Sequence, residues 1–140
     1  GWVASNTEVA DILRDYRDYT MICAGVFDDM VATLVLENKE AILERNRQIV
    51  EENLALMDAW IAKEPKASWI RPASVSTSFV KLDVNRPIED FALELLQDYG
   101  VLVVPGNRFG KESHVRIGYC CDKEVLQKGL EKLSQFLNKC

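Results

Sequence analysis

The stretch "VLVVPGNRFGKESHVRIGYC", residues 101–120, holds two short apolar runs joined by a glycine-containing loop. The first run stops at Pro105-Gly106, and the second carries Arg116 in its middle. Successive side chains of a strand point to opposite faces, so alternation sorts the second run into two sets. The core set is Val115, Ile117 and Tyr119. The stretch predicts two strands of a small sheet, with a guanidinium on the face away from the core.

Two interpretations of Arg116 remain open on spacing alone. It is either a solvent-facing arginine on an edge strand or a fork for a carboxylate or phosphate, held in place by a rigid strand. Gly118 beside it leaves room for another molecule to approach. Gly106 and Gly110 in the loop allow positive φ or close backbone approach, as expected at the rim of a binding site.

The residues around this stretch extend the pattern of an α+β domain. A strand is expected over about Thr77–Leu82, after a shorter strand that ends before the break at Pro72. Pro87 suits the first position of a helix that Gly100 would cap. Strands are expected at about Val101–Val104 and His114–Tyr119. A last helix after the cap Asp122 carries a single apolar stripe, formed by Leu126, Leu130, Leu133 and Leu137.

The N-terminal half reads as helical. Its expected elements are a helix over about Thr7–Arg17, a loop over Asp18–Gly25, and helices over about Asp28–Glu37 and Lys39–Lys63. Asn46 and Asn53 lie beside the apolar stripe of the long helix. Each stands in water at the edge of the stripe or hydrogen-bonds a neighbouring element, because a buried amide without partners is costly.

The fold class that follows is α+β, with a small sheet of three to four strands, helices packed on one face and one long helix. The expected organisation is a remnant of an upstream domain at residues 1–5, a helical segment at 6–63 and an α+β domain at 64–140. These parts are expected to form one structural unit overall.

Composition excludes several classes. The 140 residues carry a net charge of −5, which argues against nucleic acid as a partner. No apolar run approaches the ~20 residues of a membrane span, so no membrane partner is expected and a cytoplasmic location is the default. Four cysteines without a C-x-x-C and a single histidine, His114, offer no metal site, and reduced thiols are expected. Phosphate-cradling glycine motifs and a G-x-S-x-G are also absent from the sequence.

The stretch "GVLVVPGNRFGKESHVRIGYC" resembles the C-terminal part of class I and II aminotransferases, the pyridoxal-phosphate enzymes of fold type I. "GLEKLSQFL" is similar to the last helix of that family, and "RNRQIVEENLALMDAW" to its long interdomain helix. "IRPASVSTSFVKLD" resembles a strand pair of the family, and Gly1-Trp2-Val3 resembles a segment shortly after its Schiff-base lysine. The resemblance spans the whole chain but only the C-terminal part of a family member.

The resemblance implies a role for each candidate site residue. Arg116 would bind the α-carboxylate of the substrate, and Asn107 and Arg108 would border the substrate side chain. Tyr19 and Thr20 would contact the active site of the partner subunit in a homodimer. It also implies pyridoxal 5'-phosphate as the cofactor of the full-length protein, with an amino acid and a 2-oxo acid as substrates. The cofactor lysine of the family lies upstream, so these 140 residues alone should hold no catalytic residue, bind no cofactor and be inactive.

Two alternatives to transamination stay open. A carbon–sulfur β-lyase of the same fold shares the features of this part of the family. A non-catalytic α+β module that senses amino acids, with Arg116 gripping the effector, belongs to a different functional class.

Overall fold

The computed structural model describes residues 2–139, so that Gly1 of the Gly1-Trp2-Val3 resemblance and Cys140 lie outside it. The chain divides into two compact units, one ending at Leu43 and the other beginning at Glu44. The first unit contains helix α1 (Thr7–Thr20) and helix α2 (Val26–Glu37). Neither helix has a buried residue among those described, although both carry large apolar side chains. The proposed domain limits at residues 5 and 63 stay a prediction.

The second unit is built on a four-stranded antiparallel sheet in the order β1-β2-β4-β3. The strands are β1 (Ala67–Trp69), β2 (Thr77–Leu82), β3 (Val104–Pro105) and β4 (His114–Gly118). Alternation makes the two faces of the central pair differ. Val80 and Leu82 of β2 join Val115 and Ile117 of β4 on a buried face, and the other face is exposed to different degrees. The expected α+β fold, with its small sheet and one covered face, is confirmed.

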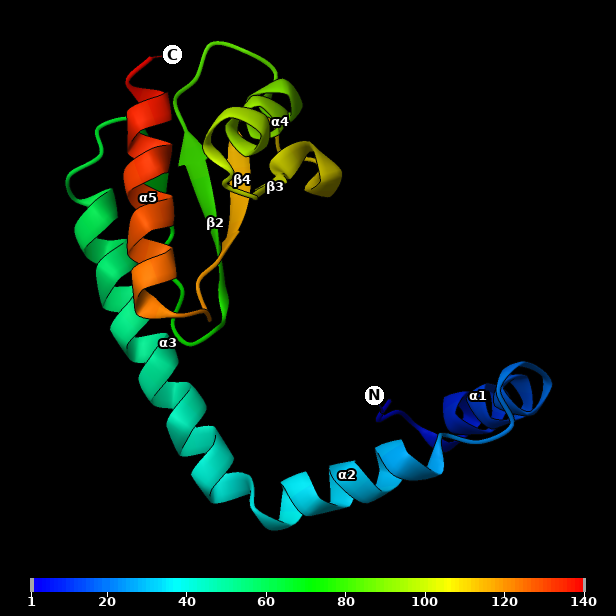
Figure 1. Ribbon diagram of the computed structural model, residues 1–140. Helices are drawn as coiled ribbons and strands as arrows, with labels where there is room; N and C mark the ends of the chain where they lie inside the picture. The colour runs from blue at the N-terminus through cyan, green and yellow to red at the C-terminus, as the bar shows by residue number, and fades with distance from the viewer. Residues whose placement is uncertain (1, 140) are drawn as a thin grey trace. The chain divides into compact units, whose positions relative to one another are not determined.

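Three helices bury the apolar face of the sheet. They are α3 (Lys39–Ile61), α4 (Ile88–Tyr99) and α5 (Lys123–Leu137), and Figure 1 shows α5 running alongside β2. The core contains Met57 from α3, Phe91 from α4 and the predicted leucine stripe of α5. The rings of Phe91 and Phe136 lie 4.8 Å apart, which joins α4 to α5 within that core.

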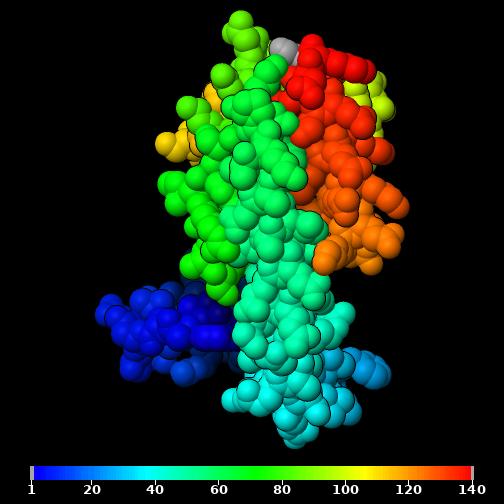
Figure 2. Space-filling model, turned by 90° about the vertical axis from the view of Figure 1, so that its left-hand side faces the viewer, coloured from blue at the N-terminus to red at the C-terminus, as the bar shows by residue number. Residues whose placement is uncertain are grey.

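Polar contacts fasten α3 to the end of the chain. The Asn53 side-chain amide, 2% exposed, donates to the backbone oxygens of Tyr119 at 2.7 Å and Cys121 at 2.8 Å. Trp60 donates to the Ser134 hydroxyl, and Figure 2 shows α5 beside the C-terminal half of α3. Asn53 thus bonds a neighbouring element, whereas Asn46 is exposed and accepts only from Arg45.

Several boundaries differ from the expectations: α2 starts and α3 ends two residues earlier, and β4 ends one residue earlier. Helix α1 continues three residues past Arg17, because its amphipathic pattern fades before its hydrogen bonds end. Pro87 precedes the first helical residue of α4 instead of occupying it. The expected strand at Val101–Val104 shrinks to Val104–Pro105, the only described residues that pair with β4 on that side. Within the expected run Val103 is buried while Leu102 is 75% exposed, so an apolar run alone decided neither burial nor strand pairing.

Candidate functional site

The side chain of Arg116 projects from the exposed face of the sheet, as alternation predicts. Strand β4 places it opposite Phe79 of β2 and Val104 of β3, so its backbone is held from both sides. Along residues 2–139 the guanidinium has neither an ion pair nor a hydrogen bond to a side chain. A planar fork of donors on a rigid strand, without an internal carboxylate, is suited to bind an anion from outside.

An aromatic cluster lies beneath this guanidinium. The guanidinium carbon of Arg116 is 5.2 Å from the ring centroid of Phe109, within cation–π range. The Phe109 ring meets Phe79 edge-on at 5.9 Å, and Phe79 stacks on the ring of His114 at 4.9 Å. His114 is thus a half-buried member of this aromatic cluster.

A hollow of about 320 Å³ opens beside Arg116. Its lining combines one cation with two aromatic rings and two hydroxyls: Arg116, Phe79, Phe109, Thr77 and Ser78. Ser78 donates its hydroxyl to the backbone oxygen of Ile117, which leaves the Arg116 guanidinium and the Thr77 hydroxyl as the polar side-chain groups among the described lining residues. The hollow can take a small molecule that pairs a carboxylate with an apolar part.

The turn that presents Phe109 is a 3-10 helix, η1 (Gly106–Phe109). A Cβ at Gly106 would lie 2.3 Å from the backbone oxygen of Lys111 and 2.6 Å from that of His114, so only glycine fits there. Gly110 ends the turn in the left-handed region at φ 70°. The turn is therefore packed tightly against the start of β4.

Asn107 and Arg108 lie on η1, where both bind the same carboxylate of α4. The Asn107 amide donates to one oxygen of Glu89 at 2.9 Å, and Arg108 forms an ion pair with the other oxygen. Asn107 Oδ1 is buried and finds no hydrogen-bond partner among residues 2–139. Both residues share the turn η1 with Phe109, which contacts Arg116, but their polar groups bind Glu89 and neither lines the hollow.

Tyr19 and Thr20 lie at the end of α1, in the first compact unit. Tyr19 is 91% exposed, and the Thr20 hydroxyl donates to the backbone oxygen of Tyr16 at 2.9 Å. Both therefore belong to a helix and not to the expected loop. The loop that follows, Met21–Gly25, holds Ile22 at φ 63° and exposes its apolar side chains.

Sequence reasoning missed Glu89 and the role of Phe109. In the sequence Glu89 looks like any acidic residue in the first turn of a helix, where a negative charge interacts favourably with the helix dipole. Phe109 stands in the quoted loop, but no sequence pattern indicates that its ring contacts Arg116, seven residues later. Neither contact has a local signal.

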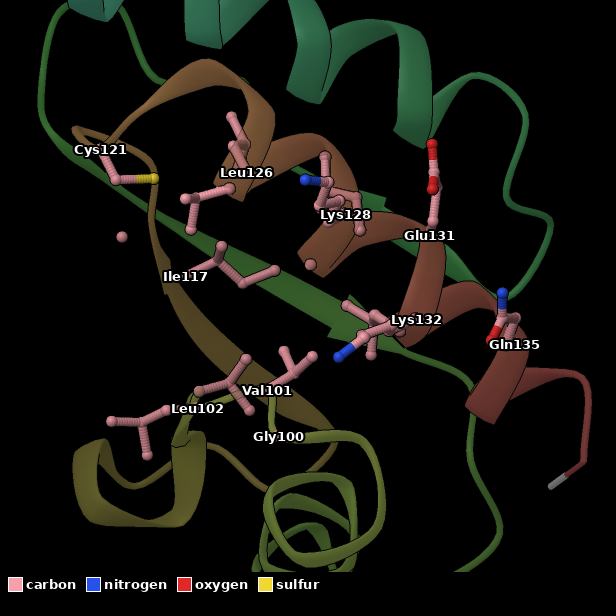
Figure 3. A pocket seen from close by; sticks show the side chains of 16 residues that line it. Gly100, Val101, Leu102, Ile117, Cys121, Leu126, Lys128, Glu131, Lys132 and Gln135 are labelled. Atoms are coloured by element: carbon pink, nitrogen blue, oxygen red, sulfur yellow. The ribbon is translucent and has the colours of Figure 1, made fainter.

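A second hollow, of about 530 Å³, lies between α5 and the segment that leads into β3. Figure 3 shows Val101, Ile117 and Leu126 converging on it from three parts of the chain. Its lysines are occupied: Lys132 donates to the backbone oxygen of Tyr99, and Lys128 pairs with Glu124. The second hollow is lined mainly by apolar side chains, and no arginine is among its described lining residues.

The described thiols form no disulfide, and Cys121 lines the second hollow. Cys23, Cys120 and Cys121 are free, as expected for reduced surface thiols, and Cys140 is outside the described part of the chain. Desolvation at the edge of the second hollow raises the pKa of Cys121, and the charge of Asp122 adds to this shift. Among residues 2–139 no group of side chains is placed to hold a metal ion.

The chain resembles known proteins along nearly its whole length. Residues 1–133 match the family model "Aminotransferase class I and II". The crystal structure of a PLP-dependent aminotransferase from Streptococcus suis 89-1591 is 66% identical, with a TM-score of 0.93, over 99% of this chain and 37% of that one.

Curated relatives are more distant. Capreomycidine synthase from Streptomyces vinaceus is 28% identical over 98% of this chain and 36% of its own length. A probable N-acetyl-LL-diaminopimelate aminotransferase from Bacillus subtilis (strain 168) is 26% identical over 99% of this chain and 36% of its own length. The chain thus spans just over a third of these relatives. By its match over residues 1–133, it belongs to the class I and II aminotransferase family.

Proposed function

We propose that the whole protein is a pyridoxal-phosphate-dependent aminotransferase that moves an amino group between an amino acid and a 2-oxo acid. In this proposal Arg116 binds the substrate α-carboxylate. The observation that carries it is the Arg116 guanidinium, which lies beside a hollow of about 320 Å³ without a carboxylate partner in the described chain. The 66% identity to a PLP-dependent aminotransferase supports the reaction class.

Arg116 would act by orientation. Two parallel N–H groups of a guanidinium bind both oxygens of a carboxylate, which fixes the plane of that group as well as its position. Strand pairing on both sides holds the Arg116 backbone, and Phe109 restricts the swing of its side chain. A carboxylate fixed in this way sets which bond at the substrate Cα is aligned for reaction.

Neither of the two hollows described above offers an unpartnered lysine to the cofactor. Lys128 and Lys132 of the second hollow are engaged by Glu124 and by a backbone carbonyl, and no lysine is among the described residues that line the hollow beside Arg116. We therefore place the cofactor-binding lysine in the remainder of the protein. When bound, pyridoxal phosphate supplies the electron sink for the reaction. In this proposal the role of the 140 residues is to bind and orient the substrate.

For Asn107 and Arg108 we propose a place at the border of the substrate side chain, with their polar groups held by Glu89. For Tyr19 and Thr20 we propose contact with a partner subunit in a homodimer. The exposed apolar surface of α1 and of the loop after it supports such a covering partner. A cytoplasmic location and the absence of nucleic-acid and membrane partners complete the proposal. None of the helices described in residues 2–139 has the length and apolar character of a membrane span.

The proposal is tested on the full-length protein loaded with pyridoxal phosphate. It would be incubated with 2-oxoglutarate and each of the common L-amino acids, and glutamate and the new 2-oxo acid would be measured. Equal yields of the two products are expected for at least one donor. Release of pyruvate from cystathionine without glutamate would favour the β-lyase. Binding of an amino acid with no turnover of any kind would favour the sensing module.

A further inference from the structure

We infer that Glu89 is a positioning residue for Arg116 and that it acts through Phe109. The inference rests on the proposed function, in which Arg116 binds the substrate carboxylate. It adds a residue on helix α4 that touches neither the hollow nor the guanidinium.

The first step is the grip of Glu89 on η1. Its two carboxylate oxygens bind two successive residues of the turn, Asn107 through the amide and Arg108 through the guanidinium. One side chain thus fixes two adjacent links of the chain, and both bonds involve an ionised group. Charge-assisted bonds of this kind are about twice as strong as neutral ones.

The second step is the position of Phe109, the residue that follows directly. At the other end of the turn Gly106 is wedged against the backbone of Lys111 and His114. With one end wedged and the middle bound to α4, η1 has little freedom left. The direction in which the Phe109 ring leaves the turn is thereby set.

The third step is the contact of that ring with the site. The ring is 50% exposed, so burial alone does not hold it. It touches the edge of Phe79 and lies 5.2 Å from the guanidinium carbon of Arg116. An exposed ring loses such a contact when its backbone moves by an ångström or two, since cation–π attraction acts within about 6 Å.

Glu89 has a second effect, on charge. It neutralises Arg108, which stands one residue from Phe109. Without the carboxylate, the Arg108 guanidinium would lose its ion-pair partner on the turn that carries Phe109. Glu89 therefore keeps this second charge paired, and Arg116 is the cation among the described residues that line the hollow.

The matched variants are Glu89→Ala and Asp90→Ala in the full-length holoenzyme. Both remove an acidic residue from the first turn of α4, but no ion pair or hydrogen bond of the Asp90 side chain occurs in the described chain. With the best donor amino acid and 2-oxoglutarate, Glu89→Ala should raise KM for the amino acid about five-fold, the loss expected for one cation–π contact. The kcat should stay within about two-fold, and Asp90→Ala should change neither constant.

A double-variant cycle separates positioning from a general loss of structure. If Glu89 acts through Phe109, the double variant Glu89→Ala/Phe109→Leu should have a KM less than about two-fold above that of Phe109→Leu alone. The inference would be overturned if the KM increase of the double variant equalled the product of the increases in the two single variants. An equal fall of kcat and kcat/KM in Glu89→Ala alone would also overturn it.

A crystal structure of the Glu89→Ala protein decides the geometry independently of activity. The Phe109 centroid should move beyond about 6 Å from the guanidinium carbon of Arg116, the limit of the contact. An unmoved ring would overturn the inference. If Arg116→Gln leaves KM unchanged, the proposed function fails, and this crystallographic result still decides whether Glu89 positions Phe109.

Discussion

The guanidinium carbon of Arg116 lies 5.2 Å from the ring centroid of Phe109, a residue that strand β4 does not contain. The ring comes from the preceding 3-10 turn, which folds back over the strand. The cation is thereby stacked on a ring instead of pairing with an acid. Its hydrogen-bond donors stay available to a ligand from solution.

Arg116→Gln in the full-length holoenzyme should raise KM for the donor amino acid about a hundred-fold. The loss of two charge-assisted bonds, together about 3 kcal/mol, accounts for that factor. Arg116→Lys should keep part of the affinity, since it keeps the charge but loses the fork. Steady-state kinetics would measure both. Arg47→Gln is the control, because Arg47 is exposed and paired with Glu44 on α3; equal effects of Arg116→Gln and Arg47→Gln would contradict the role.

Gly106→Ala should destabilise the chain by about 1–3 kcal/mol, the usual cost of forcing a methyl group into filled space. Its Cβ would lie 2.3 Å from the backbone oxygen of Lys111, and backbone cannot swing aside as a long side chain does. Gly118→Ala is the matched control on β4, because its Cβ would meet nothing within 4 Å. Urea unfolding would compare the two midpoints. Equal midpoints would show that the packing of Gly106 is not required.

Asn53→Ala should lower the free energy of unfolding by about 2 kcal/mol or more. The change leaves two acceptors, the backbone oxygens of Tyr119 and Cys121, without their donor. Asn46→Ala, two helical turns earlier on α3, should stay within about 0.5 kcal/mol because Asn46 is exposed. Equilibrium unfolding in urea checks the pair. A similar loss in both variants would mean that the amide bridge contributes nothing specific.

Tyr119→Phe should alter the stability of the chain in a pH-dependent way. Burial raises the pKa of the Tyr119 hydroxyl above its ordinary value of 10.0, an effect that the charge of Arg71 partly opposes. A pKa raised by folding stabilises the protein fully below the unfolded value, and that contribution is lost as the pH rises through the folded one. The phenol also donates to the backbone oxygen of Val75.

At pH 7 the free energy of unfolding should therefore be about 1 kcal/mol larger for the native protein than for Tyr119→Phe, which is the contribution of one hydrogen bond. The difference should shrink above about pH 10, where the unfolded phenol ionises. Urea unfolding of both proteins from pH 7 to 11 measures it. A gap that stays constant over that range would contradict the raised pKa.

The 140 residues alone should take up no pyridoxal phosphate. Lys128 and Lys132 of the second hollow are engaged, and no lysine is among the described residues that line the hollow beside Arg116. After incubation with the cofactor, reduction with borohydride and mass spectrometry, no stoichiometric adduct is expected. The full-length protein treated in parallel is the positive control, with one adduct per chain. A single adduct at one lysine of the 140-residue chain would contradict the assignment of the cofactor site to the remainder of the protein.

Local patterns in the sequence determined the order of the elements. Pro87 and Gly100 bracketed α4, and an apolar stripe at helical spacing located α5. The cap Asp122 marked the start of α5, where its side chain accepts from the Glu124 amide. Strand alternation placed Arg116 on the face away from Val115 and Ile117. Each of these features depends on residues within one or two turns of each other, which is the range over which a pattern acts.

Only the tertiary structure decided which groups meet. Glu89 binds residues 18 and 19 positions later, and Asn53 binds carbonyls 66 and 68 positions later. The length of β3 depended in the same way on where β4 lies. Such contacts arise from the packing of whole helices and strands. The sequence alone therefore determined that Arg116 faces outward, and tertiary packing decided that it rests on Phe109, in a turn held by Glu89.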